Sequence, residues 1–376
     1  MKKLIILMFI FLLCSCSFNK TENHSDDYLQ KCEELGIQEI TVVQKDKIES
    51  VSFDDDTFWK KYIKGDIILF SSVFQKDRKL KLYPYVMSKN VVSYELYSLI
   101  MENKSASSGV KEFPRTMSWY DAIVFCNELT KIVFSEKHCV YYSDKKLKTV
   151  YTKDDAKDKK EVFIAYDMSK KMFTKKGYRL PTELEWEFAA RGGNPESPEW
   201  NYTYSGTNCG GEIYNPSNKS NNHLEPIFRK GNEYWVEGLL YIDPRIKEYS
   251  NCAYEILDDY IMQKIGKKKS NSLGINDMSG TIYEWTWDGA EKDGMYPVDA
   301  ADILYKTEGW IQNPLGPELQ EAHIIKGGSY NSGAYECCVF FRKYEKSQTS
   351  GIAGIRLCRS IQGEKIKESE YKHNKE

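Results

Sequence analysis

Residues 177–193 have the sequence GYRLPTELEWEFAARGG, which combines a turn, a helix start and a compact aromatic helix in one short segment. Thr182 is placed to cap a helix, and Glu185, three residues later, can accept a hydrogen bond from the Thr182 amide. Leu184 and Phe188 then recur at helical spacing, and a pair of glycines ends the segment. The stretch therefore predicts a capped helix with a buried face.

The N-terminus has the organisation of an export signal. Lys2-Lys3 supply positive charge, and the apolar run from Leu4 to Leu13 is too short to span a bilayer. The tetrapeptide Leu-Cys-Ser-Cys that ends at Cys16 resembles the lipobox at which bacterial lipoproteins are lipidated and cleaved; the alternative is an ordinary cleaved signal peptide. We expect residues 1–15 to be removed and Cys16 to carry palmitate-type acyl chains, each buried methylene contributing about 0.8 kcal/mol. The protein would then be anchored in the bacterial cell envelope on the extracytoplasmic side.

The composition of the chain limits which partners it can bind and what kind of hydrophobic core it can form. The formal net charge is -2, so the chain lacks the basic footprint of a nucleic-acid-binding protein. Aromatic residues make up 14% of the chain, which favours a core of large rings connected by many loops. Nucleic acid is therefore not an expected partner, and the membrane is expected only through the lipid anchor.

The cysteines suit an exported protein but not a zinc protein. None of their spacings gives a Cys-x-x-Cys pair, and the five histidines are scattered. Some of them can pair as disulfides, although spacing alone leaves the connectivity open. Of the ten cysteines, eight follow Cys16, namely Cys32, Cys126, Cys139, Cys209, Cys252, Cys337, Cys338 and Cys358.

The chain beyond the signal divides into a tether, one domain and a tail. Residues 16–59 are polar and charged and predict a tether, whereas 362–376 predict a solvated charged tail. Short strands, a few short helices and long loops over 60–361 predict one α+β domain. Two long excursions, 144–176 and about 205–270, interrupt it, and loops of this length usually line a binding surface or are partly disordered.

Three further elements are predicted inside the domain. Leu82 to Met87 has the composition of a strand. Ser93 is placed to cap a helix that ends near residue 101, and Ser118 with Asp121 repeats this capping pattern before a second apolar helix.

These segments resemble, in order, the motifs of the formylglycine-generating-enzyme family, also called the sulfatase-modifying-factor family. The most specific block is the 177–193 stretch. The resemblance implies the loop-rich, C-type-lectin-like fold of that family. The other matching blocks are residues 93–97, 117–126, 273–285, 313–317, 326–330 and 354–356.

The resemblance also implies a copper site with two cysteine ligands, of which this sequence has only one at the expected position. Family members that oxidise a sulfatase cysteine use two cysteines after the Gly-Gly-Ser-Tyr turn, since thiolates suit Cu(I). Here the first position is Ser332 and the second is Cys337, and Cys338 could replace the missing thiolate only with a distorted loop. We therefore interpret Cys337 and Cys338 as packed or disulfide-bonded, with a copper-dependent formylglycine-generating oxidase using Cys337 as the alternative.

The family's calcium site and disulfide are implied in weakened form. Thr281 stands where the family has asparagine and Glu284 is retained, so calcium would be held by these side chains and by main-chain carbonyls such as those of Ile282 and Thr286. Glu284 is equally well interpreted as a buried acid hydrogen-bonded to backbone amides. Cys126 and Cys358 lie near the positions of a family disulfide, although Cys358 falls one residue late.

The carboxylates of the 177–193 stretch could suggest acid–base chemistry. However, Glu183, Glu185 and Glu187 follow a helix start, where acids ordinarily complement the helix dipole. We therefore interpret them as structural.

Residues 330–349 predict a recognition surface for a protein or small-molecule ligand of unknown identity. Tyrosine rings supply rigid area and short polar groups supply hydrogen bonds. The segment resembles the ligand-binding tip of variable lectin-fold proteins diversified by retroelements, although Phe340 and Phe341 are also typical of a core. The expected ligand-binding residues are Tyr330, Asn331, Ser332, Tyr335, Glu336, Arg342 and Tyr344. The sequence as a whole favours a non-catalytic, lipid-anchored binding or structural module over the oxidase.

Overall fold

A computed structural model describes most of the predicted domain. The described residues are 24–44, 49–52, 79–202, 204–207, 246–252, 261–290, 311–312, 315 and 321–361. The signal segment, Cys16, Cys209, the 362–376 tail and most of the second excursion lie outside them. Within the described residues, no helix has both the length and the apolar character needed to cross a membrane.

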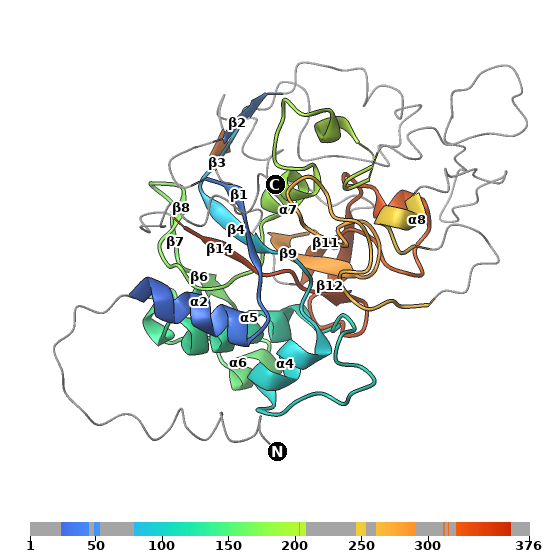
Figure 1. The fold of residues 1–376 in the computed structure, drawn as a ribbon. Helices are drawn as coiled ribbons and strands as arrows, with labels where there is room; N and C mark the ends of the chain where they lie inside the picture. The colour runs from blue at the N-terminus through green and yellow to red at the C-terminus, as the bar shows by residue number, and fades with distance from the viewer. Residues whose placement is uncertain are drawn as a thin grey trace, which may run out of the picture.

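Within the described residues, the domain consists of three sheets of three or four strands, two two-stranded sheets and a group of helices (Figure 1). The central sheet has the strand order β12-β11-β9-β13, with β9 at Tyr283–Gly289 and β11 at Ala322–Lys326 running antiparallel. A second sheet has the order β1-β4-β14, and the third has the order β10-β3-β2. Helices α2, α4, α5 and α6 lie together on one side in Figure 1, and α7 lies beside β9 and β11.

The remaining elements are short, as the sequence predicts for a loop-rich α+β fold. The helices are α2 His24–Glu34, α4 Tyr94–Met101, α5 Trp119–Val133, α6 Lys153–Lys157, α7 Glu183–Ala190 and α8 Ile246–Tyr249, with 3-10 turns η1 Glu136–His138, η2 Pro198–Asn201 and η3 Ala334–Cys337. The other strands are β1 Glu39–Val43, β2 Glu49–Ser52, β3 Lys79–Leu82, β4 Tyr85–Ser88, β5 Tyr141–Tyr142, β6 Phe163–Ile164, β7 Tyr166–Asp167, β8 Met172–Phe173, β10 Ile311–Gln312, β12 Lys343–Lys346, β13 Ala353–Gly354 and β14 Cys358–Ser360. The predicted strand 82–87 is divided, since β3 ends at Leu82 and β4 begins at Tyr85.

The capping prediction for α7 is confirmed. Thr182 Oγ1 accepts a hydrogen bond from the Glu185 amide at 3.2 Å, and Glu185 accepts one from the Thr182 amide at 2.9 Å. Every side chain of α7 is buried, so the helix is enclosed on all sides and not only on one face. The predicted caps Ser93 and Ser118 also accept hydrogen bonds, from Leu96 N and Asp121 N.

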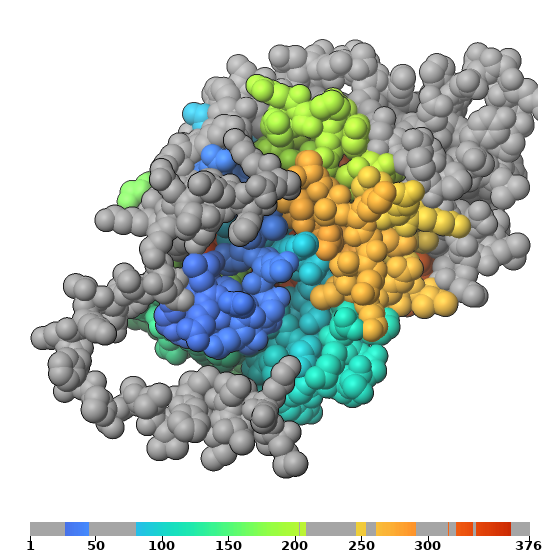
Figure 2. All heavy atoms as spheres, viewed as in Figure 1, coloured from blue at the N-terminus to red at the C-terminus, as the bar shows by residue number. Residues whose placement is uncertain are grey.

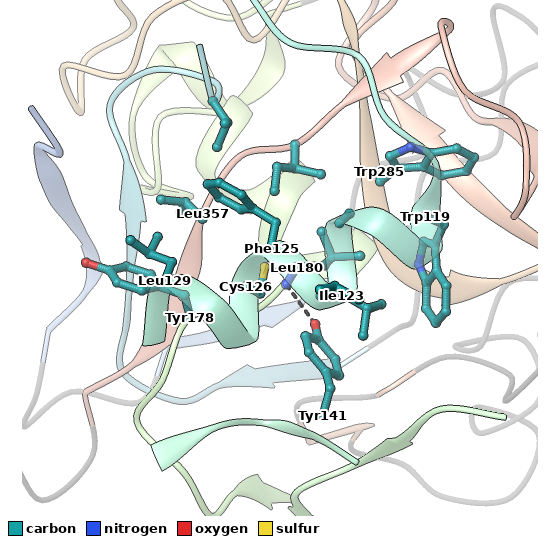
Figure 3. Close-up of a cluster of buried hydrophobic side chains, with 14 of the residues drawn as sticks. Trp119, Ile123, Phe125, Cys126, Leu129, Tyr141, Tyr178, Leu180, Trp285 and Leu357 are labelled. Atoms are coloured by element: carbon teal, nitrogen blue, oxygen red, sulfur yellow. Dashed lines mark hydrogen bonds between the residues drawn. The ribbon is translucent and has the colours of Figure 1, made fainter. Parts of the chain in front are cut away.

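Helix α5 runs through the largest hydrophobic cluster, which Figure 3 shows in close-up. Its Phe125 and Cys126 are fully buried and lie among residues of distant segments, including Trp285 of β9 and Leu357. The Leu180 amide donates a hydrogen bond to the Tyr141 hydroxyl at 2.8 Å. This bond ties the turn before α7 to β5.

The predicted polar tether is wrong for residues 24–43. Helix α2 packs against α5, and β1 pairs antiparallel with β4. Cys32 and Ile37 belong to the main hydrophobic cluster, and Glu39 accepts hydrogen bonds from the Arg359 guanidinium at 2.7 to 3.1 Å. Figure 2 shows this segment in blue, lying directly on the body of the domain. The folded unit therefore begins before the predicted boundary at residue 60.

The first excursion is also structured. Between 144 and 176 the chain forms α6, β6 and the β7–β8 hairpin, and β6 pairs with β5. Tyr151 is fully buried within it and donates a hydrogen bond to the Lys160 carbonyl at 2.9 Å.

The disulfide that the resemblance implied between Cys126 and Cys358 is not formed. Both are free, buried cysteines. The thiol of Cys358 instead points to Glu185 Oε2 at 3.8 Å, and Cys126 packs in the hydrophobic cluster around α5.

Candidate functional site

A double-glycine turn positions the candidate site at the end of β11. Gly327 and Gly328 have φ angles of +90° and +71°, a region that side chains with a Cβ rarely adopt. A Cβ on Gly328 would lie 2.5 Å from the sulfur of Cys337, and one on Gly327 would lie 3.1 Å from the Trp186 ring. The turn thus brings the backbone into direct contact with Cys337 and holds the following loop against α7.

The loop after this turn carries a chain of hydroxyl groups that ends at a carboxylate. Ser329 Oγ and Ser332 Oγ are 3.0 Å apart, and Ser332 Oγ donates to the Tyr283 hydroxyl at 3.0 Å. The Tyr283 hydroxyl in turn donates to Glu336. Lys343 Nζ lies 3.9 Å from the Glu336 carboxylate and 5.0 Å from the centroid of the Tyr283 ring. These bonds orient the hydroxyl groups of Ser332 and Tyr283 at the base of the loop, and they keep the Glu336 carboxylate near the Lys343 ammonium.

The Glu336 carboxylate sits in a partly desolvated position. Burial raises its pKa, and the nearby Lys343 ammonium opposes that rise. A carboxylate in such a place accepts hydrogen bonds strongly, so it favours a ligand that presents N–H or O–H donors.

Four of the predicted ligand-binding residues lie around this chain. Tyr330 is half-buried, with its amide donating to the Thr281 carbonyl at 3.2 Å, and Asn331 is exposed. Ser332 is buried and committed to the hydroxyl chain, and Glu336 is half-buried. The Tyr335 side chain lies outside the described residues.

Arg342 is a correction to the predicted recognition surface. Its guanidinium is buried and makes two hydrogen bonds to the Glu183 carboxylate, at 2.5 and 2.7 Å. Tyr344 is only half-buried but packs against a small cluster that contains Ala322 and Ile324. The alternative of a core role holds for Phe340, which is buried in a second hydrophobic cluster that also contains Trp186 and Phe188, and Phe341 packs against this second cluster.

Cys337 has a thiol neighbour that sequence reasoning missed. Its side chain is fully buried, and its thiol has the Cys252 thiol as a side-chain hydrogen-bond partner. Burial raises the pKa of the Cys337 thiol well above its usual value. Cys338, also buried, interacts instead with the Tyr204 hydroxyl. No spacing rule joins Cys252 to Cys337, because the contact is made only by the fold.

The residues of the predicted calcium site are committed to other partners. Both oxygens of Glu284 accept hydrogen bonds from Arg356, at 2.7 to 3.2 Å, and one accepts from Trp186 Nε1 at 2.7 Å. The Thr286 carbonyl, which was the expected ligand atom, accepts a hydrogen bond from Trp119 Nε1 at 3.1 Å, and Thr286 Oγ1 donates to the Ile324 carbonyl at 3.0 Å. The contacts favour the interpretation of Glu284 as a buried acid, with a guanidinium and an indole as donors rather than backbone amides.

The described residues offer no alternative metal centre. Among them, no group of three or more histidine, cysteine, aspartate or glutamate side chains could hold a metal ion. The backbone at the predicted ligand positions Thr281 and Ile282 forms a turn: Thr281 has a φ of +69°, its amide donates to the Asn251 carbonyl at 2.7 Å, and the Ile282 amide donates to the Gly280 carbonyl at 2.9 Å. Calcium therefore stays a prediction without support from the geometry.

The acids of α7 are enclosed by cations. Glu185 pairs with Arg179 at 2.7 Å and Glu187 with Arg191 at 2.9 Å. Lys326 Nζ lies 3.3 Å from Glu187 and is also close to Glu183. These acids are structural, as expected, but through ion pairs rather than through the helix dipole alone.

Comparison with known proteins identifies the fold. A family model described as the sulfatase-modifying factor enzyme 1-like domain matches residues 75–361. Among solved structures, Treponema denticola variable protein 1 is similar with a TM-score of 0.52 and 21% identity, over 86% of this chain and 99% of that one. The crystal structure of CarF has a TM-score of 0.52 and 16% identity, over 87% and 100%. At these identities the likeness shows the fold alone, which confirms the predicted fold class.

Two curated relatives differ in how much of their length is shared. The chaperone protein LppX of Paenibacillus barcinonensis is 26% identical over 304 residues, which are 79% of this chain and 88% of the relative. A formylglycine-generating enzyme of Thermomonospora curvata is 26% identical over 154 residues, which are 41% of this chain and 39% of that enzyme.

Proposed function

The chain belongs to the family of the sulfatase-modifying factor enzyme 1-like domain, and we propose that it uses this fold to bind a polypeptide rather than to oxidise one. In this proposal it is a non-catalytic module of the bacterial cell envelope, anchored by acyl chains on Cys16. The recognition face is the loop after the double-glycine turn, with Tyr330, Asn331 and Glu336 at its surface.

One observation carries the non-catalytic part of the proposal. At the position where the oxidising members have their first thiolate, this chain has Ser332, whose hydroxyl donates to Tyr283 and lies beside Ser329. A hydroxyl is a hard, neutral donor with little affinity for Cu(I). The group is thus part of a hydrogen-bonded scaffold rather than half of a soft-metal site.

Two further observations support a protein ligand. The relative that shares most of its length with this chain is described as a chaperone protein. The loop also presents an exposed amide at Asn331, a half-buried ring at Tyr330 and a half-buried carboxylate at Glu336. Such a mixture of rigid area and adaptable hydrogen-bonding groups is typical of surfaces that recognise polypeptides.

Oxidase activity is tested with a Cys-x-Pro-x-Arg peptide and protein purified after loading with Cu(I). We expect no aldehyde product by mass spectrometry and no copper retained after desalting. Turnover that a Cys337→Ser substitution abolishes would overturn the non-catalytic proposal.

Binding is tested by suppression of the aggregation of a chemically unfolded model protein, followed by light scattering. Wild-type protein is expected to suppress aggregation, and the variants Tyr330→Ala and Asn331→Ala to do so at least threefold less well. Lys104→Ala, at an exposed position after α4, is the matched control and should equal wild type. If Tyr330→Ala and Asn331→Ala suppressed aggregation as well as Lys104→Ala does, the assignment of the loop as the recognition face would be wrong.

The anchor is tested separately by metabolic labelling with an alkyne-tagged palmitate. The wild-type chain should be labelled and sediment with membranes. Cys16→Ala should lose the label and the sedimentation, whereas Cys14→Ala should keep the label. Labelling that survives in Cys16→Ala would show that the lipidation site is wrong.

The oxidase is retained as a second candidate because of one contact. Cys252 places a second thiol beside Cys337, so a two-sulfur site is chemically conceivable through a residue other than the family's. The copper-retention measurement above decides between the two candidates. Retention of one equivalent of copper by the wild-type protein, and of none by Cys252→Ser or Cys337→Ser, would favour the oxidase.

A further inference from the structure

Three cysteines meet beside the candidate site from segments far apart in the sequence. Cys252 follows α8, whereas Cys337 ends η3 and Cys338 comes next. Cys337 and Cys338 belong to the second hydrophobic cluster, and Cys252 packs against it. We propose that Cys252 and Cys337 are a redox pair that closes to a disulfide and fastens segment 250–252 to the recognition loop.

Backbone contacts hold both ends of this pair in place. Asn251, adjacent to Cys252, forms an isolated parallel bridge with Gly280, and its carbonyl accepts from the Thr281 amide at 2.7 Å. A Cβ on Gly280 would overlap the Asn251 carbonyl, so only glycine permits this approach. On the other side, Gly328 lies directly against Cys337. The backbone on both sides of the thiol pair is therefore held by close contacts with neighbouring segments.

The other cysteines of the described residues have different partners. The Cys139 thiol donates to the Asn127 carbonyl at 3.5 Å, and the Cys358 thiol points to Glu185. Cys338 has the Tyr204 hydroxyl as its side-chain hydrogen-bond partner, although Cys252 also lies near it. The contact thus selects Cys252 as the partner of Cys337.

Exposure sets the order of the chemical steps. Cys252 is half-buried, whereas Cys337 is fully buried, so an oxidant meets Cys252 first. The Cys252 thiolate attacks the disulfide of an oxidant, such as oxidised glutathione or a protein disulfide, and releases one oxidant thiol. Cys337, after losing its proton, then attacks the Cys252 sulfur and expels the second thiol. The two cysteines lose two protons and two electrons, and the oxidant's disulfide takes up both pairs.

The bridge would act on the recognition face through a short path. Cys337 ends η3, which also contains Glu336, the carboxylate at the end of the hydroxyl chain. The Asn251 carbonyl accepts a hydrogen bond from the Thr281 amide, and Thr281 lies two residues before Tyr283, whose hydroxyl is part of the chain of hydroxyl groups. Closing the disulfide therefore links the two segments that support Tyr283 and Glu336, and it would reduce the freedom of the loop when it binds.

The test uses the purified full chain, reduced and then incubated with oxidised glutathione. After alkylation and proteolysis, we expect a cross-linked peptide pair containing Cys252 and Cys337, lighter by about 2 Da than the two free-thiol peptides together. Cys252→Ser and Cys337→Ser should each abolish it, and Cys139→Ser, a buried cysteine elsewhere, should leave it intact. The oxidised protein should also melt about 5 °C higher than the reduced protein, reversibly with dithiothreitol.

Three results would overturn the proposal. They are full alkylation of Cys252 and Cys337 after oxidation, glutathione remaining on Cys252 as a stable mixed disulfide, and a cross-link from either residue to Cys338 or Cys209. Export to an oxidising compartment, proposed above, determines where the bridge forms in the cell. Because the test uses purified protein, a failure of the export proposal would leave its outcome unchanged.

Discussion

Replacement of Arg356 by methionine tests the interpretation of Glu284 most directly. The guanidinium is fully buried and donates hydrogen bonds to both Glu284 oxygens, to the Ser88 and Lys89 carbonyls at 3.0 and 2.7 Å, and to the Asn276 carbonyl at 2.8 Å. Methionine keeps the apolar stem but removes all five donors. The substitution therefore leaves a buried carboxylate without its cation.

The expected loss of stability is large. Removing one partner of a buried ion pair costs about 3–5 kcal/mol, and each backbone carbonyl that loses its donor adds about 1 kcal/mol. Since a domain is stable by only about 5–15 kcal/mol, Arg356→Met should bring the protein close to unfolding at 25 °C. Urea titration followed by tryptophan fluorescence measures the change as a lower midpoint at constant slope.

A matched control separates burial from charge. Lys111 also pairs with a glutamate, Glu95, at 3.2 Å, but both side chains are about one-third exposed. Lys111→Met should therefore change the free energy of unfolding by less than about 1 kcal/mol. In the double variant Arg356→Met/Glu284→Gln, the buried charge is gone and much of the loss should be recovered.

The same titration distinguishes an ion pair from a calcium site. If Arg356 compensates Glu284, a chelator such as EDTA leaves the wild-type midpoint unchanged. A midpoint that falls with EDTA and rises with added calcium would restore the calcium prediction. Stability of Arg356→Met within about 1 kcal/mol of wild type, or no recovery in the double variant, would refute the reasoning from the ion pair.

Three shorter predictions concern a buried histidine, the glycine turn and the helix cap. His323 is buried, and desolvation holds its pKa well below the usual 6.5, so the unfolded chain binds a proton more readily than the folded chain. The free energy of unfolding should therefore fall as the pH drops below about 6.5, by at most about 1.4 kcal/mol per pH unit. In His323→Phe, the urea midpoint should depend less on pH between 7.5 and 5.5 than in the wild type. Gly328→Ala should cost more than about 2 kcal/mol in urea titration, because it adds overlap with a buried sulfur to the strain of positive φ, whereas Gly351→Ala, with φ +94° and open space around it, should cost only the strain, about 1 kcal/mol. Thr182→Ala should lose about 1 kcal/mol by the same measurement, and a loss below 0.3 kcal/mol would show that the capping box contributes little.

The local features of the fold could be predicted from sequence because their causes are local. A capping serine or threonine acts within three residues, and all three predicted caps, Ser93, Ser118 and Thr182, accept the expected backbone hydrogen bond. The same holds for the double-glycine turn, whose positive φ angles require glycine.

The features that sequence reasoning missed depend on contacts between distant segments. Helix α2 is mostly polar: Cys32 and the nearby Ile37 are buried in the core, and Tyr28 and Leu35 pack against it, so its composition resembles that of a tether. What holds this segment is the pairing of β1 with β4 and the bond between Glu39 and Arg359, which are 320 residues apart. The prediction that Arg342 belongs to the recognition surface fails for the same reason, since its partner Glu183 lies in α7.

These buried ion pairs also explain why the sequence identifies the family more readily than the activity. The acids of the most specific motif, Glu183, Glu185 and Glu187, are each matched by a buried cation, and Glu284 of the second block is matched by Arg356. An unpaired charge in the interior is far more destabilising than a misplaced surface residue, so such acids and their partners must be retained together for the chain to fold. The motifs are therefore requirements of the scaffold, and they would be needed whether or not the protein carried out chemistry. In the proposal made above, the position that bears on oxidation lies outside this network, and there the chain has the hydroxyl of Ser332.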